Sequence, residues 1–151
     1  MKSQNFYTFT EYMKENKLTI SEEDYLEMIY RLCINNNLTR VNEIAQSINV
    51  KAPSVTNMLK RLVEKKLVIH VEYGIVKLTD EGKKIGALLL ERHLIVEDFL
   101  KIINVNDNLL EETEKIEHTV SPTTILKIKQ LVTFFDENEN IKLLFNQFIN
   151  D

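Results

Sequence analysis

Hydrophobic residues recur every three or four positions along most of this chain, which is the spacing of helices with one buried side. Two shorter apolar runs, Leu67–Val71 and Ile75–Leu78, flank Tyr73-Gly74 and predict a β-hairpin. The pattern therefore predicts a mainly α-helical fold with one small hairpin. Helices are expected from Ser21 to about Asn35, over Val41–Ser47, from Ala52, from about Asp80 to Ile103, from about Asn108, from Pro122 and from about Glu139.

Polar residues and prolines mark where these helices begin. Ser21 is the predicted N-cap of its helix, with Asp24 as the acidic partner three residues on. Pro53 and Pro122 suit first helical turns, because the missing amide of proline costs no intrahelical hydrogen bond there. The long helix follows the capping sequence Thr79-Asp80-Glu81-Gly82, and its length suits an element that leaves one domain and enters another.

The apolar side of each helix predicts the core. His93 comes four positions after Leu89 on the buried side of the long helix, where a satisfied core histidine and a metal ligand are both possible. Cys33 is the only cysteine and is expected to be a buried structural thiol. The residues expected to be buried in the C-terminal half are Ile85, Leu89, Val96, Phe99, Leu100, Ile125, Ile128, Leu131, Val132, Phe135, Ile141, Leu144, Phe145 and Phe148.

The order of the elements predicts three regions. Residues 1–20 form an N-terminal extension, in which Phe6, Phe9, Tyr12 and Met13 suit a short amphipathic helix that docks on the body or on a second subunit. Residues 21–79 read as helix, turn, helix and hairpin, which is the arrangement of a winged helix-turn-helix. Residues 80–151 are helical.

Composition and charge restrict the classes of function that this chain can have. The chain has three glycines and two prolines, and it has no signal peptide or membrane-spanning run, so we expect a cytoplasmic protein. The net charge of −4 is unevenly distributed: residues 38–84 hold nine Lys/Arg against five Asp/Glu, whereas residues 111–151 hold eight acids against four lysines. A basic middle and an acidic end indicate two tasks on one chain.

The basic middle predicts a DNA-binding surface. A helix that presents short polar side chains and two cations can enter a major groove and reach base edges and phosphates. Lys65 and Lys66 lie nearby and add positive charge. The alternative is a winged helix that contacts only proteins. The predicted DNA contacts are Arg40, Lys51, Pro53, Ser54, Thr56, Asn57, Lys60, Arg61 and Lys77.

A second kind of chemistry is concentrated around Glu114-Lys115-Ile116-Glu117-His118. On a helix, Glu114, Glu117 and His118 project from one side, so two carboxylates and one imidazole can face a divalent cation. Asp24 and Glu27, one turn apart on the first helix, offer two more carboxylates. Each of these groups alone also suits a solvated acidic turn or a helix start that favours negative charge.

Taken together, these segments resemble the diphtheria-toxin-repressor family of metal-dependent repressors, and within it the manganese transport regulators. The resemblance runs through 21–27, 52–56, 78–86, 91–93 and 114–118. It implies a homodimer in which Asp24, Glu27, His93, Glu114, Glu117 and His118 hold two metal ions per subunit. Iron-responsive members carry methionine in place of Asp24 and cysteine in place of Glu114, so the carboxylates here favour Mn²⁺, with Fe²⁺ or another divalent cation as the alternative.

The resemblance implies a repressor of metal uptake that binds a palindromic operator when metal is loaded. We expect the short, manganese type of chain, without the small third domain of the iron branch. The N-terminal extension is longer than the manganese branch would lead us to expect. A dinuclear carboxylate enzyme is the competing class. It needs two Glu-x-x-His pairs on facing helices, which this sequence lacks, and there is no nucleotide loop or nucleophile elbow, so we expect no enzyme. A winged-helix regulator that responds to a small molecule is a further alternative.

Overall fold

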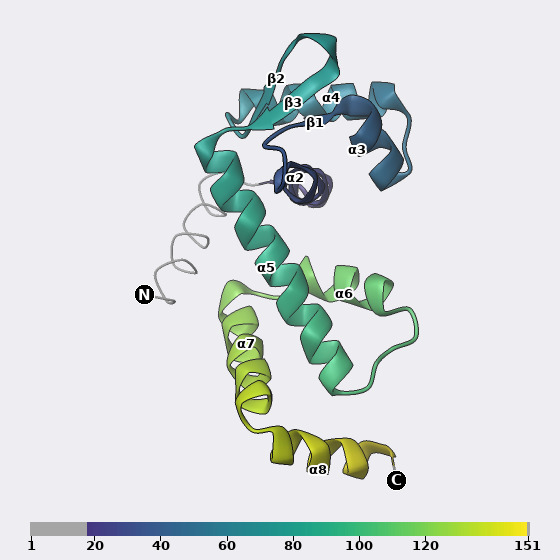
Figure 1. Cartoon of the computed structure of the whole chain (residues 1–151), viewed down its shortest axis with the longest axis vertical. Coiled ribbons are helices and arrows are strands. Elements are labelled where there is room, and N and C mark those ends of the chain that lie inside the picture. The colour runs from purple at the N-terminus through teal and green to yellow at the C-terminus, as the bar shows by residue number, and fades with distance from the viewer. Residues whose placement is uncertain (1–17, 151) are drawn as a thin grey trace. The chain divides into compact units, whose positions relative to one another are not determined.

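A computed structural model describes residues 18–150 of the chain (Figure 1). These residues divide into two compact units, 18–90 and 91–150, and the long helix α5 (Asp80–Ile102) belongs in part to each. The fold is mainly helical, as predicted. The helix predicted for the N-terminal extension lies outside the described residues. Across 18–150, no helix is both long and apolar enough to cross a membrane.

The N-terminal unit is a winged helix. It contains α2 (Ile20–Cys33), α3 (Val41–Ile48), α4 (Ala52–Glu64) and an antiparallel sheet of three strands. The predicted hairpin is formed by β2 (Val68–His70) and β3 (Ile75–Leu78), and β1 (Thr39–Arg40) pairs with the other edge of β3 (Figure 1). Strand β1 has only two residues, which is too short to show an alternating pattern, so the sequence did not predict it.

The start of α2 differs from the prediction of an N-cap at Ser21. Thr19 is the N-cap: its hydroxyl accepts a hydrogen bond from the N–H of Glu22 at 3.2 Å. The carboxylate of Glu22 accepts one from the N–H of Thr19 at 2.9 Å and completes a capping box. The prediction with Ser21 and Asp24 is therefore wrong, because the longer glutamate side chain can reach back to the first amide and Thr19 supplies the hydroxyl.

One hydrophobic core holds the N-terminal unit together. Leu26 and Ile29 of α2 pack with Leu59 and Leu62 of α4, and all four side chains have no exposed surface. Each such side chain contributes roughly 1.5–3 kcal/mol through its removal from water. The thiol of Cys33 is buried in the same core, as predicted. These contacts hold α2 against the helix that is expected to meet DNA.

Two glycines let α5 lie close to this core. A Cβ at Gly82 would stand 1.9 Å from the carbonyl oxygen of Leu67, and one at Gly86 would stand 2.6 Å from Cβ of Tyr30. Both distances are far shorter than any real contact, so only glycine fits at either position. Glycine often ends a helix in the left-handed conformation, but here an asparagine does so. Asn49 ends α3 with a φ of 58°, a left-handed conformation that asparagine tolerates.

The C-terminal unit is built from the second part of α5 with α6 (Leu109–Glu117), α7 (Pro122–Glu137) and α8 (Glu139–Asn150). Ser121 caps α7 by accepting a hydrogen bond from the N–H of Thr124 at 3.3 Å, and Pro122 stands in the first turn, as predicted. Val96 and Leu100 of α5 pack with Ile125 of α7 to form a small core. This core fixes α5 beside the helices that follow it.

The prediction that α8 buries its apolar side is wrong for the described chain. Leu144 is 65% exposed and Phe148 is 78% exposed, and Ile141 on the same side of the helix is also exposed. Leu131 of α7 is exposed as well, against the prediction. Phe145 does find an aromatic partner, because its ring centroid lies 5.3 Å from that of Phe135. The helical period identifies an apolar side correctly, but it does not say whether the same chain covers that side.

Candidate metal centre and DNA-binding surface

His93 of α5 faces two glutamates of α6. Its Nδ1 atom lies 3.2 Å from Oε1 of Glu117 and 3.6 Å from Oε1 of Glu114. His93 and Glu117 are both almost completely buried, with 3% and 2% of their surface exposed. Burial of a carboxylate beside an imidazole is favourable only when the two groups satisfy each other or share a cation. The contact therefore brings two of the predicted ligands together across 24 residues of sequence.

The second histidine joins the same cluster. Nε2 of His118 lies 3.4 Å from Oε2 of Glu114 and 3.7 Å from Oε1 of Glu117. A hydrogen bond from His118 lowers the pKa of the Glu114 carboxyl below its ordinary value, although partial burial opposes this shift. All four predicted ligands of the C-terminal unit thus converge, and Glu114 is held in the charged form that a cation requires.

The donor set of this cluster fits a divalent cation. Oε2 of Glu117 is buried and has no hydrogen-bond partner among the described residues. A buried carboxylate oxygen without a partner is costly, and a bound cation would satisfy it. Two carboxylates and two imidazoles form a set of oxygen and nitrogen donors, which suits manganese and related metals better than soft ones.

The other two predicted ligands belong to the N-terminal unit. Asp24 is exposed on α2, and Glu27 is partly buried one turn further along the same helix. The Glu27 carboxylate accepts contacts from Arg31, with Nη2 at 3.0 Å and Nε at 3.1 Å. The two carboxylates lie at helical spacing, as the sequence indicates, and their place in the metal centre stays a prediction.

Two further side chains touch the histidines and were not predicted. Nε2 of His93 lies 3.3 Å from Oε2 of Glu97, and Nη2 of Arg92 lies 3.2 Å from Nδ1 of His118. Contacts of this kind orient a histidine ligand and select its tautomer. Glu97 stands four residues after His93, so the helical spacing could have revealed it, whereas nothing in the sequence marks the buried Arg92.

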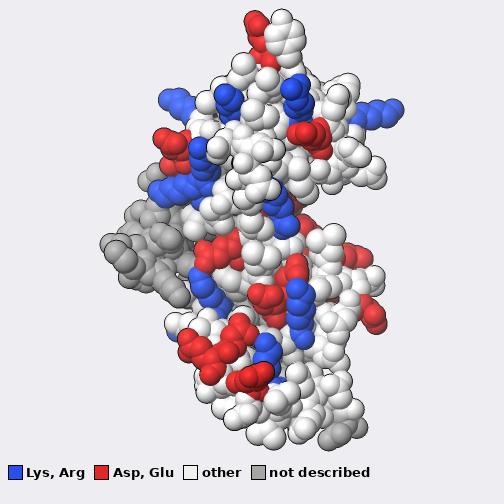
Figure 2. All heavy atoms as spheres, in the orientation of Figure 1, with Lys and Arg blue, Asp and Glu red and all other residues white. Residues whose placement is uncertain are grey.

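The candidate DNA-binding residues lie on α4, at its N-cap and on strands β1 and β3. Helix α4 presents exposed Pro53, Ser54, Asn57 and Lys60, while Thr56 is partly buried and donates its hydroxyl to the carbonyl of Ala52 at 3.2 Å. Lys51 is exposed as the N-cap of α4, Arg40 is exposed at the N-cap of α3, and Lys77 is exposed on β3. Figure 2 shows Lys and Arg side chains distributed over the winged-helix unit, with fewer acidic groups among them.

Arg61 is the exception in this set. Its side chain is 51% exposed, yet Nη2 lies 2.9 Å from Oε1 of Glu22, a buried residue of α2. The guanidinium is therefore paired with a carboxylate on one side, which the sequence pattern alone did not indicate. For every residue of the set, an individual contact with DNA stays a prediction.

Comparisons with known proteins match both units. A family model described as "Iron dependent repressor, N-terminal DNA binding domain" matches residues 17–76, and one described as "Iron dependent repressor, metal binding and dimerisation domain" matches residues 79–142. The HTH-type transcriptional regulator MntR of Shouchella clausii is 41% identical over 122 residues, which is 80% of this chain and 85% of that protein.

Solved structures give the same result. The structure titled "Structure of the manganese regulator SloR" superposes with a TM-score of 0.66 and 30% identity and covers 75% of this chain and 54% of its own. A second, titled "Manganese-dependent transcriptional repressor complex with manganese", superposes with a TM-score of 0.67 and 28% identity. It covers 75% of this chain and 53% of its own. This chain thus spans about half the length of these solved chains. The relatives are transcriptional regulators rather than enzymes. The chain belongs to the diphtheria-toxin-repressor family of metal-dependent transcriptional repressors, in its branch of manganese transport regulators.

Proposed function

We propose that this protein represses genes of metal uptake and binds its operator when Mn²⁺ is loaded. The observation that carries the proposal is the buried cluster of His93, Glu114, Glu117 and His118, in which a carboxylate oxygen lacks a partner among the described residues. These four side chains form the part of the metal centre that the C-terminal unit supplies. Their oxygen and nitrogen atoms favour Mn²⁺, with Fe²⁺ as the second candidate because its ligand preferences are close.

Asp24 and Glu27 complete the centre, and two ions per subunit bind to the six residues together. The four carboxylates of this set carry the same formal charge as the whole chain, −4, which two divalent cations would neutralise. Without metal, these carboxylates repel one another and disfavour any arrangement that gathers them. Metal binding therefore selects one arrangement of the winged helix and the C-terminal unit. By linkage, DNA that prefers this arrangement tightens metal binding in return.

The partner on DNA is a second copy of this chain. The apolar side of α8 carries Ile141, Leu144 and Phe148, all exposed in the described chain. An exposed apolar stripe of this size is typical of an interaction surface. The family model described as a dimerisation domain matches residues 79–142 and ends near the start of α8, so the use of this stripe between subunits is our proposal. A symmetric dimer presents two α4 helices, so the operator is expected to be palindromic, with half-sites one or two helical turns apart.

Fluorescence anisotropy on a labelled palindromic promoter fragment tests the proposal. The full chain is titrated in buffer with Mn²⁺ and in the same buffer with a chelator, and bound metal is counted per chain. We expect about two Mn²⁺ per chain and much tighter binding with metal than with chelator. Equally tight binding in both buffers would contradict the proposal. Tight binding with Fe²⁺ and none with Mn²⁺ would instead place the protein with the iron-responsive members.

A further inference from the structure

Glu22 is a buried acid of the winged-helix unit, and it lies behind a surface that is expected to bind DNA phosphates. Its side chain is 1% exposed, and it lies on the first turn of α2. Oε1 lies 2.9 Å from Nη2 of Arg61, and Oε2 lies 2.6 Å from Nζ of Lys65. Both partners come from the C-terminal end of α4, so one carboxylate of α2 holds two cations of the neighbouring helix.

The backbone of α2 restricts the Glu22 carboxylate further. Oε2 also accepts the N–H of Thr19 at 2.9 Å, as part of the capping box at the start of the helix. A carboxylate held by a backbone amide and by the helix that carries it has few other positions available. The cations that it binds are therefore held in place by a rigid group and not by another flexible surface side chain.

Arg61 and Lys65 remain accessible while they are held. They stand one turn apart on α4 and its C-cap, so both side chains leave the same side of the helix. Arg61 is 51% exposed at its side chain and Lys65 is 30% exposed. An arginine head has five N–H donors, so an edge engaged by Glu22 leaves donors that can reach a phosphate oxygen.

We infer that Glu22 is a positioning residue that holds Arg61 and Lys65 as a clamp for one DNA phosphate. The inference rests on the proposed function and deepens it. Arg61 then contacts the DNA backbone rather than a base, because the tether to Glu22 fixes where its head can go. Side chains that are already held lose less entropy when phosphate binds, so the contact is stronger than two free cations would give.

Replacing Glu22 distinguishes the clamp from a general effect of net charge on DNA binding. Glu22→Gln keeps the shape and can still accept the N–H of Thr19, but it makes the protein more positive by one charge. Glu81→Gln, at an exposed position in the first turn of α5, makes the same change of charge away from the clamp. Positive charge alone predicts equal or tighter DNA binding for both variants. The clamp predicts that Glu22→Gln weakens Mn²⁺-loaded operator binding about tenfold, the scale of one charge-assisted hydrogen bond, while Glu81→Gln does not weaken it.

Two further variants keep the test decisive if Glu22→Gln folds poorly. Arg61→Gln changes an exposed side chain and Lys65→Gln a half-buried one. Each is expected to weaken binding to the operator and to an unrelated duplex by the same factor. Each should also reduce the slope of log affinity against log salt by about one. In a chain that carries both of these changes, adding Glu22→Gln should weaken binding no further, whereas a merely structural role would still add its effect.

The outcomes distinguish the clamp from the proposed function. If the unchanged protein binds DNA equally with Mn²⁺ and with chelator, the proposed function fails. If it responds to Mn²⁺ but Glu22→Gln binds the operator as tightly as Glu81→Gln, the clamp alone is overturned. Loss of sequence discrimination in Arg61→Gln, with unchanged binding to unrelated DNA, would also overturn the clamp and make Arg61 a base contact.

Discussion

Nδ1 of His93 on α5 lies 3.2 Å from Oε1 of Glu117 on α6, and both side chains are buried. This contact partly satisfies two groups that would otherwise be costly to bury. The fold itself therefore brings these two candidate ligands together. We expect a cation bound here to replace contacts between ligands that are already close, which limits the entropy that binding costs.

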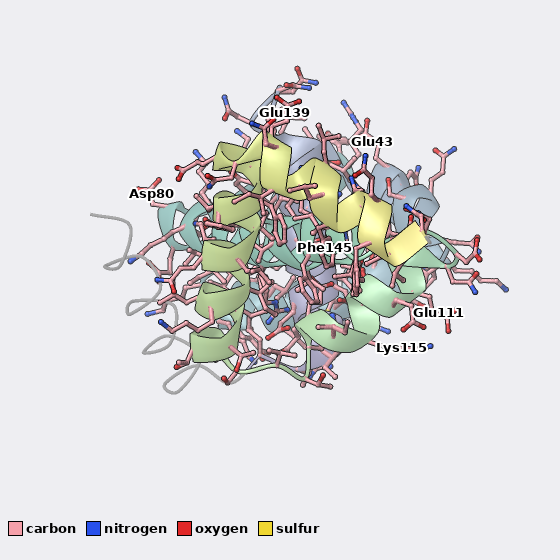
Figure 3. All side chains as sticks on the ribbon, turned by 90° about the horizontal axis from the view of Figure 1, so that it is seen from below. Glu43, Asp80, Glu111, Lys115, Glu139 and Phe145 are labelled. Atoms are coloured by element: carbon pink, nitrogen blue, oxygen red, sulfur yellow. The ribbon has the colours of Figure 1, made fainter. Side chains whose placement is uncertain are left out.

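Substitution of the proposed metal ligands at α6 should weaken metal binding, whereas substitution of another acid on this helix should not. Glu114→Ala and His118→Ala are expected to weaken Mn²⁺ binding by at least tenfold and to abolish the metal response of operator binding, because each removes a donor from the cluster. Glu111→Ala is the matched control: Glu111 lies on the exposed side of the same helix, paired with Lys115 at 2.7 Å (Figure 3). Equilibrium dialysis with Mn²⁺ measures the affinities. A wild-type response in Glu114→Ala would remove that residue from the centre.

The carboxylate at Glu114 should determine which metal is preferred. A thiolate favours softer cations, so Glu114→Cys is expected to raise the affinity for Zn²⁺ relative to Mn²⁺. Competition between the two metals, read by isothermal titration under reducing conditions, measures the ratio. Glu111→Cys introduces the same thiol outside the cluster and should leave the ratio unchanged. An unchanged ratio in Glu114→Cys would mean that this side chain does not bind the metal.

The apolar side of α8 should hold the dimer together. Leu144→Asp and Phe148→Asp each place a charge within this exposed stripe and are expected to give monomers that bind the operator weakly. Gln147→Asp changes an exposed polar position on the same helix and should leave the dimer intact. Sedimentation equilibrium measures the molecular mass. Dimers in both apolar variants would show that another surface joins the subunits.

Gly82 should be intolerant of any side chain. Gly82→Ala would place a methyl group 1.9 Å from the carbonyl oxygen of Leu67, which already accepts the N–H of Thr79 at 3.1 Å. The helix or the hairpin must move, and the free energy of unfolding should fall by roughly 1–3 kcal/mol. Urea titration followed by circular dichroism measures the change. Lys83→Ala alters the next, exposed residue and should have little effect, and equal stabilities would show that α5 can shift without cost.

Glu43 should make the stability of the winged helix depend on pH. Its carboxylate accepts hydrogen bonds from the hydroxyl of Thr39 at 2.7 Å and from the N–H of Arg40 at 3.0 Å, and these bonds lower its pKa. A lowered pKa stabilises the folded protein above the unfolded pKa, and the contribution disappears as pH falls through the folded value. Glu43→Gln should therefore be less stable than wild type near pH 7, and the difference should shrink near pH 3. A difference that is the same at both pH values would contradict this assignment.

Local patterns in the sequence were enough to predict the fold class and the types of side chain that are candidate metal ligands. Helical period and capping residues placed the starts of α3 to α8 close to their observed positions, and Ser121-Pro122 marked the start of α7. The spacing of Glu114, Glu117 and His118 was enough to indicate that the three side chains share one side of a helix. Such features depend on interactions between residues a few positions apart, which a linear sequence displays directly.

Tertiary structure decided what those residues touch. Sequence could not show that Glu22 is buried against Lys65, 43 positions away, or that Arg92 reaches His118. It also misjudged α8, whose apolar side is real but is not covered by the described chain. Burial and pairing depend on which surfaces meet after the helices pack, and that outcome is decided by the whole core. The residue types of the candidate metal centre were therefore readable from the sequence, whereas the partners that hold its histidines, and the buried carboxylate behind the helix that is proposed to meet DNA, appear only in the folded chain.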